Sequence, residues 1–148
     1  MKKLLLSIVF MVIFTFSYSQ LNIQDGKYYV SNDLCNGEYT EFYDSGEIHS
    51  LMYFKNGLIV GKMYEYDKLG KLIEIRAYSE GEFDGIWTSY KDGKKTFVAS
   101  YKDGIKDGKW LVWNDKGNIV YEINYKLGKK ISTKEFDDNG KVIKEHKY

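Results

Sequence analysis

The sequence predicts an all-β fold, an elongated antiparallel meander of tandem β-hairpins. Three observations carry this prediction. Glycines recur in columns 23 or 24 residues apart, the residues between them alternate apolar and polar, and aromatic residues make up 17% of a chain that has no proline. Alternation with a period of two is the pattern of half-buried strands. A fixed repeat of this length is typical of linear repeat proteins, and the rings favour strands as the core elements.

We expect three parts along the chain. Residues 1–19 are predicted to be a signal peptide, residues 20–36 a lead-in with a partial repeat, and residues 37–148 an array of about five hairpin units. A mature chain of about 129 residues is the usual size of one domain.

The signal peptide prediction depends on charge and length. Lys2 and Lys3 precede an apolar run over residues 4–16, and Ser17 and Ser19 are small residues at the two positions that a signal peptidase reads. The run is shorter than the roughly 20 residues that a membrane-spanning helix needs. We therefore expect cleavage after Ser19, a periplasmic or secreted location, and no transmembrane segment in the mature chain. An uncleaved anchor is the alternative.

The charge balance excludes some partners. The predicted cleavage removes two lysines and leaves 20 basic and 21 acidic residues, a formal net charge of −1. Such a chain has no global attraction to nucleic acid or to anionic lipid. Cys35 is the only cysteine, so it cannot form an intramolecular disulfide, and we interpret it as a small buried hydrophobe.

The fourteen glycines fall into three columns. One column opens the units: Gly37, Gly61, Gly85 and Gly108, with Gly26 heading the partial unit. A second marks the turn inside each hairpin: Gly46, Gly70, Gly93, Gly117 and Gly140. A third marks the return to the next unit: Gly57, Gly81, Gly104 and Gly128. Many follow Asp or Asn, the pairs that hairpin turns prefer.

Large apolar residues occupy the third and sixth positions of the units. They are Tyr39 and Phe42, Met63 and Tyr66, Trp87 and Tyr90, and Trp110 and Trp113. Equivalent positions of successive hairpins lie about 10 Å apart, two strand spacings, so the rings are predicted to form a ladder. We interpret this ladder as the stripe that holds the array together. The alternative is that one face presents rings to a ligand or protein.

Other motifs do not predict chemistry. His49 and His146 are separated by about four hairpins, too far for a shared metal or acid–base pair. The run from Asp137 to Gly140 resembles part of a calcium loop but lacks the remaining ligand spacing, so we interpret it as a hairpin turn. We expect no catalytic residues, no metal and no cofactor.

The repeat resembles the MORN repeat, in particular its bacterial variant. The matching residues are Gly85, Trp87, Tyr90, Gly93, Tyr101 and Gly104, then Gly108, Trp110, Trp113, Gly117 and Tyr125. The resemblance extends from Gly26 to Tyr148. The departures are Met63 at an aromatic position, a short third unit, and Ile131 where the fifth opening glycine is expected.

The resemblance implies a binding or scaffold function and no enzyme activity. It suggests a protein partner or an envelope surface. The near-neutral net charge of the mature chain argues against binding to a lipid surface. One bacterial branch, the YwqK-like group, is labelled as an antitoxin. An antitoxin or immunity-like protein that neutralises a partner toxin is therefore the alternative function.

Charge is distributed unevenly along the chain. Residues 20–90 contain 6 basic and 12 acidic residues, whereas residues 91–148 contain 14 and 9. In a linear array the order in sequence is the order in space, so one end should be acidic and the other basic. Lys94, Lys95 and Lys129 are candidates for binding an acidic partner, an anionic surface or the acidic end of another copy. The alternative is that lysines only keep the strands soluble.

Overall fold

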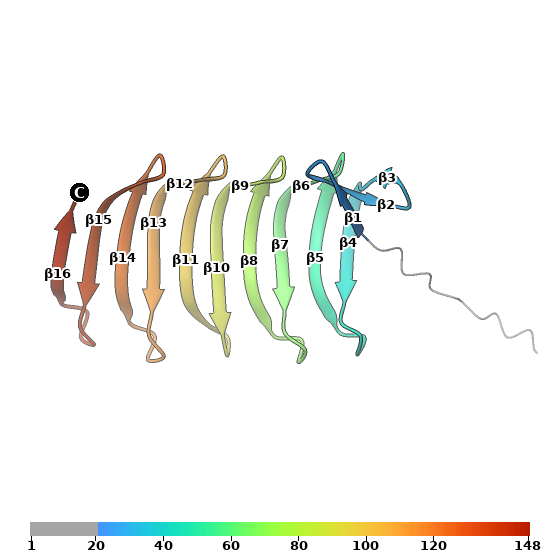
Figure 1. The fold of residues 1–148 in the computed structure, drawn as a ribbon. Helices are drawn as coiled ribbons and strands as arrows, with labels where there is room; N and C mark the ends of the chain where they lie inside the picture. The colour runs from blue at the N-terminus through green and yellow to red at the C-terminus, as the bar shows by residue number, and fades with distance from the viewer. Residues whose placement is uncertain (1–20) are drawn as a thin grey trace, which may run out of the picture.

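The computed structural model describes residues 21–148. The predicted signal peptide, residues 1–19, lies outside the described residues. The described residues form sixteen strands and no helix (Figure 1), which confirms the all-β prediction. No helix that could cross a membrane therefore occurs in this part of the chain.

The strands form two sheets. The small sheet contains β1 (Leu21–Gln24), β2 (Lys27–Val30) and β3 (Asp33–Leu34). The large sheet contains thirteen strands and is an antiparallel meander of five hairpins, as predicted. The hairpins are β4 (Gly37–Phe42) with β5 (Ile48–Lys55), β7 (Gly61–Tyr66) with β8 (Leu72–Ser79), β10 (Gly85–Lys91) with β11 (Lys94–Lys102), β13 (Gly108–Trp113) with β14 (Ile119–Lys126), and β15 (Lys129–Phe136) with β16 (Val142–Lys147). Short strands β6 (Leu58–Ile59), β9 (Glu82–Phe83) and β12 (Ile105–Lys106) follow the first three return turns.

All fourteen glycines have positive φ, as turn glycines require. In the return turns a left-handed residue precedes the glycine, as in Asn56 (φ 51°) before Gly57 (φ 75°). Two positive φ values in succession define a type I′ turn, whose twist matches that of the flanking strands. Gly26 follows Asp25 at φ 49° and has this geometry. It belongs with the return-turn glycines, so its assignment to the opening column is wrong.

Successive return turns are linked by a chain of hydrogen bonds. The amide of each turn glycine donates to a carbonyl of the preceding unit: Gly57 to Cys35, Gly81 to Ile59, Gly104 to Phe83 and Gly128 to Lys106, over 2.8–2.9 Å. The first acceptor directly follows β3. The small sheet therefore stands where the return turn of a preceding unit would be, and we interpret it as the N-terminal cap of the array.

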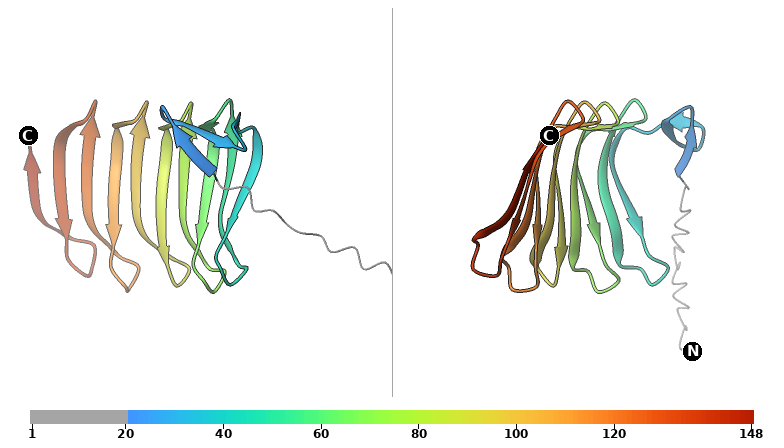
Figure 2. Two further views of the ribbon diagram at one scale, coloured as in Figure 1. Left: turned by 45° about the vertical axis from the view of Figure 1, so that its right-hand side comes forward. Right: turned by 60° about the vertical axis from the view of Figure 1, so that its left-hand side comes forward.

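The buried core lies at this N-terminal end. Cys35, Met52, Phe54 and Ile59 form the cluster of buried hydrophobic residues, and Tyr28 and other side chains of the small sheet pack against it. The small sheet lies against one face of the β4–β5 hairpin, near its return turn (Figure 2). Further along the array the apolar side chains other than Ala99 are half-buried or exposed, because within residues 21–148 no second layer covers them.

The last unit departs from the others at its entry. Three positions separate Gly128 from Ile131, whereas four separate Gly104 from Gly108. The shorter connection allows β15 to run without a break and to pair with β14 at six positions. The earlier junctions between hairpins pair at two positions each. The absence of an opening glycine at Ile131 thus accompanies a longer strand, of eight residues in β15 against six in β13.

Candidate binding surface

The third and sixth positions of each unit lie on opposite faces of the sheet. Trp87 and Tyr90 are three residues apart on β10, and side chains alternate along a strand. The single ladder predicted from the sequence is therefore wrong, and the rings form two rows. The stripe row contains the third-position residues, Tyr39, Met63, Trp87 and Trp110, with the return-strand rings beside them. The tip row contains the sixth-position residues, Phe42, Tyr66, Tyr90, Trp113 and Phe136, next to the hairpin tips.

The rings of the stripe row contact one another. Centroid distances are 5.6 Å from Phe83 to Trp87, 5.4 Å from Tyr101 to Trp110 and 4.9 Å from Trp110 to Tyr125. The ammonium of Lys106 lies 4.3 Å from the Trp110 centroid. Such contacts stabilise neighbouring strands. The stripe row therefore holds the array together.

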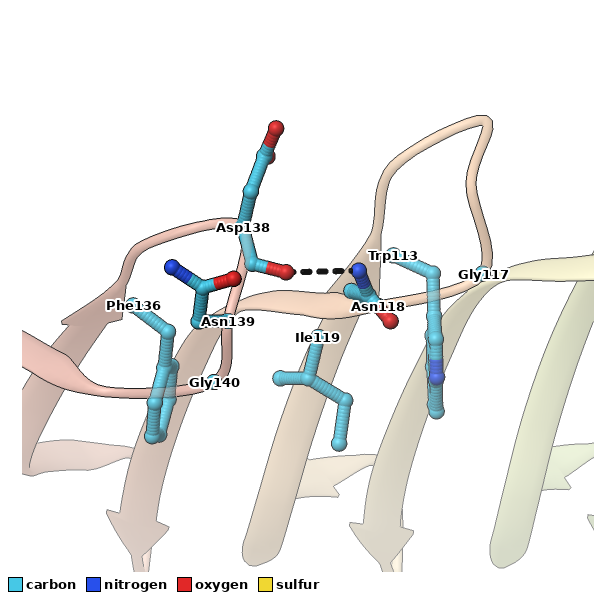
Figure 3. Close-up of a pocket in the computed structure, with 8 residues that line it drawn as sticks. All are labelled: Trp113, Gly117, Asn118, Ile119, Phe136, Asp138, Asn139 and Gly140. Carbon is cyan, nitrogen blue, oxygen red and sulfur yellow. Dashed lines mark hydrogen bonds between the residues drawn. The ribbon is translucent and has the colours of Figure 1, made fainter.

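The rings of the tip row are arranged differently. Among residues 21–148 no two of its five rings are in contact. Each is paired within its hairpin with an aliphatic or basic residue: Ile48, Leu72, Lys95, Ile119 and Val142. Figure 3 shows Trp113 and Phe136 on either side of Ile119. They line a cleft of 420 Å³ whose rim includes Asn118, which donates its amide to the Asp138 carbonyl over 2.8 Å. A cleft of this size can hold one or two side chains of a partner.

The same cleft recurs two units earlier. Leu72 and Tyr90 occupy the positions of Ile119 and Phe136, and together with Gly93 they line a cleft of 430 Å³. Its rim is an ion pair between Lys71 and Asp92, with nitrogen and oxygen 3.3 Å apart. An apolar cleft with a polar rim thus lies beside the hairpin tips at two places in the array, two units apart.

The tip row contains a positive charge between these clefts. Lys95 pairs with Tyr90 in the β10–β11 ladder, where other units have an aliphatic residue, and it is exposed. Lys94, beside it, reaches the Asp115 carbonyl over 3.4 Å. Lys129 lies at the return-turn end of β15, at the other end of the strands (Figure 1). The structure therefore brings Lys94 and Lys95 together at the tips and does not bring Lys129 to them.

A polar cluster interrupts the stripe row. Arg76 forms ion pairs with Glu65, at 2.9 Å, and with Glu74. Burial alone would lower the pKa of Arg76, but the two carboxylates outweigh it and the pKa is raised. Both carboxylates are partly buried and neutralised by the arginine, which is a structural arrangement.

The histidines and acidic turn residues lie in separate places. His49 on β5 lies 3.9 Å from Glu41 on β4. His146 lies on β16, at the other end of the sheet, and its ring contacts the Tyr148 ring edge to face. Asp137 accepts hydrogen bonds from the amides of Asn139 and Lys141, so its carboxylate closes the hairpin turn. No cluster of three or more side chains that could hold a metal occurs in residues 21–148.

The fold and its two rows of rings define a linear β-hairpin repeat protein. The family model of the MORN repeat variant matches residues 36–56 and 106–127, so the chain contains MORN-variant repeats at these two places. These lie in the first and fourth hairpin units. Such repeats indicate a repeat-based binding or scaffold protein.

No curated protein matches the sequence. Among solved structures, a mutant of S. aureus TarM in complex with fondaparinux, α-GlcNAc-glycerol and UDP is similar, with 16% identity and a TM-score of 0.43. The match covers 75% of this chain and 20% of the TarM chain.

Proposed function

We propose that this chain is an exported, non-enzymatic binding protein and that its tip row is the surface that holds a protein partner. The observation that carries the proposal is the contrast between the two rows. Rings of the stripe row contact one another, whereas rings of the tip row flank clefts that recur along the array. Rings that are half-buried or exposed and contact no other ring of their row are available to a partner, and aromatic side chains are enriched in binding hot spots.

The chemistry of the tip row suggests the character of the partner. Its clefts accept apolar side chains, and Lys95, which pairs with Tyr90, provides positive charge between that ring and the next. A partner segment that alternates apolar and acidic side chains would satisfy both. Because the two clefts lie two units apart on one sheet, an extended segment is expected to span more than one unit.

The test is capture of a partner from the envelope fraction of the producing cells. The double variant Trp113→Ala and Phe136→Ala removes the walls of one cleft and is expected to lose the partner. The matched control is Ile86→Ala, an exposed residue at the return-turn half of the sheet, which should retain it. Equal capture by wild type and the double variant would exclude the tip row as the binding surface.

The identity of the captured protein separates the two functions suggested by the repeat. If the purified partner is an enzyme and its activity falls in proportion to the amount of this protein added, the chain is an antitoxin or immunity-like protein. A partner without such inhibition supports a scaffold.

A further inference from the structure

The large sheet has two uncovered edges in the part of the chain that the structure describes. They are β4 at the start of the strand order and β16 at its end. The small sheet packs in front of the β4–β5 hairpin and does not extend along the outer edge of β4 (Figures 1 and 2). An open edge presents unpaired N–H and C=O groups that can pair with another strand.

The junctions between hairpins follow one register. The second strand of each hairpin pairs with the first strand of the next through Ser50 and Glu65, Glu74 and Ser89, Phe97 and Val112, and Tyr121 and Glu135. The same row continues within the hairpins, where Glu41 pairs with Ser50 in the first hairpin and Glu135 pairs with Lys144 in the last. All of these residues therefore lie in one cross-strand row that begins at Glu41 and ends at Lys144.

Continuing this register beyond β16 gives a specific partner for each edge residue. A further strand in the position of β4 would place Glu41 opposite Lys144. Three positions further along the same strands, Glu38 corresponds to Lys147, because Glu38 pairs with Tyr53 in the first hairpin and Ser132 pairs with Lys147 in the last. Residues at this position approach each other across a junction, as when Ser100 donates to the Lys109 carbonyl over 3.0 Å.

From this register we propose that β16 of one copy pairs with β4 of a second copy, head to tail, with Lys144 against Glu41 and Lys147 near Glu38. Opposite charges directly across strands stabilise a sheet, and like charges destabilise it. In the register of the row from Glu41 to Lys144, pairing of β16 with β16 sets Lys144 against Lys144, and pairing of β4 with β4 brings together charged side chains that are all acidic. The head-to-tail contact is therefore favoured over both symmetric contacts.

The backbone also supports the head-to-tail junction. In three junctions a carbonyl of the second strand accepts the amide that precedes the next opening glycine: Tyr53 from Val60, Ala77 from Asp84 and Ser100 from Asp107, over 2.9–3.1 Å. The equivalent carbonyl on β16 is that of Lys147, and the equivalent amide is that of Asn36. Tyr148 donates inward to the Ile131 carbonyl, so the alternation of the ladder directs the backbone groups of Lys147 outward.

The hairpin tips complete the junction. Phe42 and Val142 are exposed by 48% and 40%. In the cleft between the fourth and fifth units, the positions that correspond to Val142 and Phe42 are Ile119 and Phe136. The contact between copies would form one more such cleft and continue the tip row from one molecule to the next. Because this contact is heterologous, it produces open linear assemblies rather than closed dimers.

Sedimentation velocity of the purified protein over a range of concentrations tests the proposal. The wild-type protein is expected to associate with increasing concentration, and less so at high salt because exposed charges are screened. The tail variant, Lys144→Glu with Lys147→Glu, and the head variant, Glu38→Lys with Glu41→Lys, should each weaken association on the order of a hundredfold. Mixing the two variants should restore it, since each then meets an opposite charge.

Two further variants separate strand pairing from general charge effects. Lys129→Glu with Lys130→Glu changes the same charge in the same hairpin away from the edge, and should associate as wild type does. Glu145→Pro removes an outward-directed amide and should abolish association while leaving the melting temperature close to that of wild type. A wild-type protein that remains monomeric, or head and tail variants whose mixture stays monomeric, would overturn the proposal.

Discussion

The guanidinium carbon of Arg76 lies 5.0 Å from the ring centroid of Trp87, across the junction between the second and third hairpins. Arg76 is the only arginine in the sequence. It also neutralises Glu65 and Glu74, which face each other across the β7–β8 ladder. One side chain therefore joins two hairpins through a cation–π contact and separates two like charges.

Replacing Arg76 should destabilise the array. Arg76→Ala leaves two partly buried carboxylates opposite each other and is expected to cost roughly 1–3 kcal/mol of unfolding free energy. Arg76→Lys should recover only part of this loss, because lysine has no planar fork to hold both carboxylates. Urea unfolding measures the difference. Lys116→Ala, which breaks an exposed pair with Asp138, is the control and should cost less than about 1 kcal/mol.

Two glycines with similar backbone angles should respond differently to alanine. Gly57 and Gly70 have φ of 75° and 73°, so either substitution carries a backbone cost of roughly 1–2 kcal/mol. A Cβ at Gly57 would also lie 2.9 Å from the Tyr28 carbonyl oxygen, whereas a Cβ at Gly70 meets nothing within 4 Å. Gly57→Ala should therefore lower the melting temperature further. Equal effects would show that the cap does not depend on close contact with the first return turn.

Leu127 offers a stabilising substitution. It has φ of 47° at the first position of a return turn, where Asn56 and Asp103 stand in other units. Its side chain is 72% exposed, so little packing is lost when it is replaced. Leu127→Asn should raise the unfolding free energy by about 1 kcal/mol, because asparagine tolerates the left-handed region. Leu127→Ala should give no comparable gain, and thermal melting of the two variants distinguishes a backbone effect from a solubility effect.

Acid should weaken the return turns. Hydrogen bonds from Lys102 and from the Asp103 amide lower the pKa of Asp84. The Leu127 amide and Lys126 do the same for Asp107. A carboxyl whose folded pKa is lowered contributes stability that is complete above its unfolded pKa, near 3.8, and is lost as the pH falls through the folded value. The melting temperature should therefore decline below about pH 4. The double variant Asp84→Asn with Asp107→Asn should show a shallower decline.

Export predicts a specific mass. Protein recovered from its native host should begin at Gln20, with residues 1–19 removed after Ser19. Intact-mass measurement distinguishes this product from an uncleaved chain. Retention of the first nineteen residues would contradict both the cleavage site and the proposed periplasmic or secreted location.

The hairpin array could be predicted because its signals are local. Pairs such as Asp92-Gly93 specify their turns within a few residues, and alternation within β14 identifies a half-buried strand without reference to its neighbours. The connection before Ile131 is one residue shorter than in the earlier units, and this can be read from the sequence. The longer β15 that accompanies it depends on pairing with β14 and could not be predicted.

The candidate surface was harder to predict because it depends on contacts between units. Trp87 and Tyr90 are three residues apart, and an odd separation places two side chains on opposite faces of a strand. The two rows could therefore have been predicted by counting residues along the strand. The partners of Arg76 and the cap formed by the small sheet could not be found in this way. They depend on which strands become neighbours and on how a segment outside the repeat packs against Phe54.

The position of the buried cluster determines the order in which the molecule comes apart. Cys35, Met52, Phe54 and Ile59 lie at the cap, whereas every residue of β16 is exposed. In a linear array each unit is stabilised mainly by its neighbours, so opening begins where fewest contacts must break. Backbone amides should therefore exchange with solvent fastest in the last hairpin and progressively more slowly toward β5. The array is therefore expected to unfold from its C-terminal hairpin toward the N-terminal cap, which opens last.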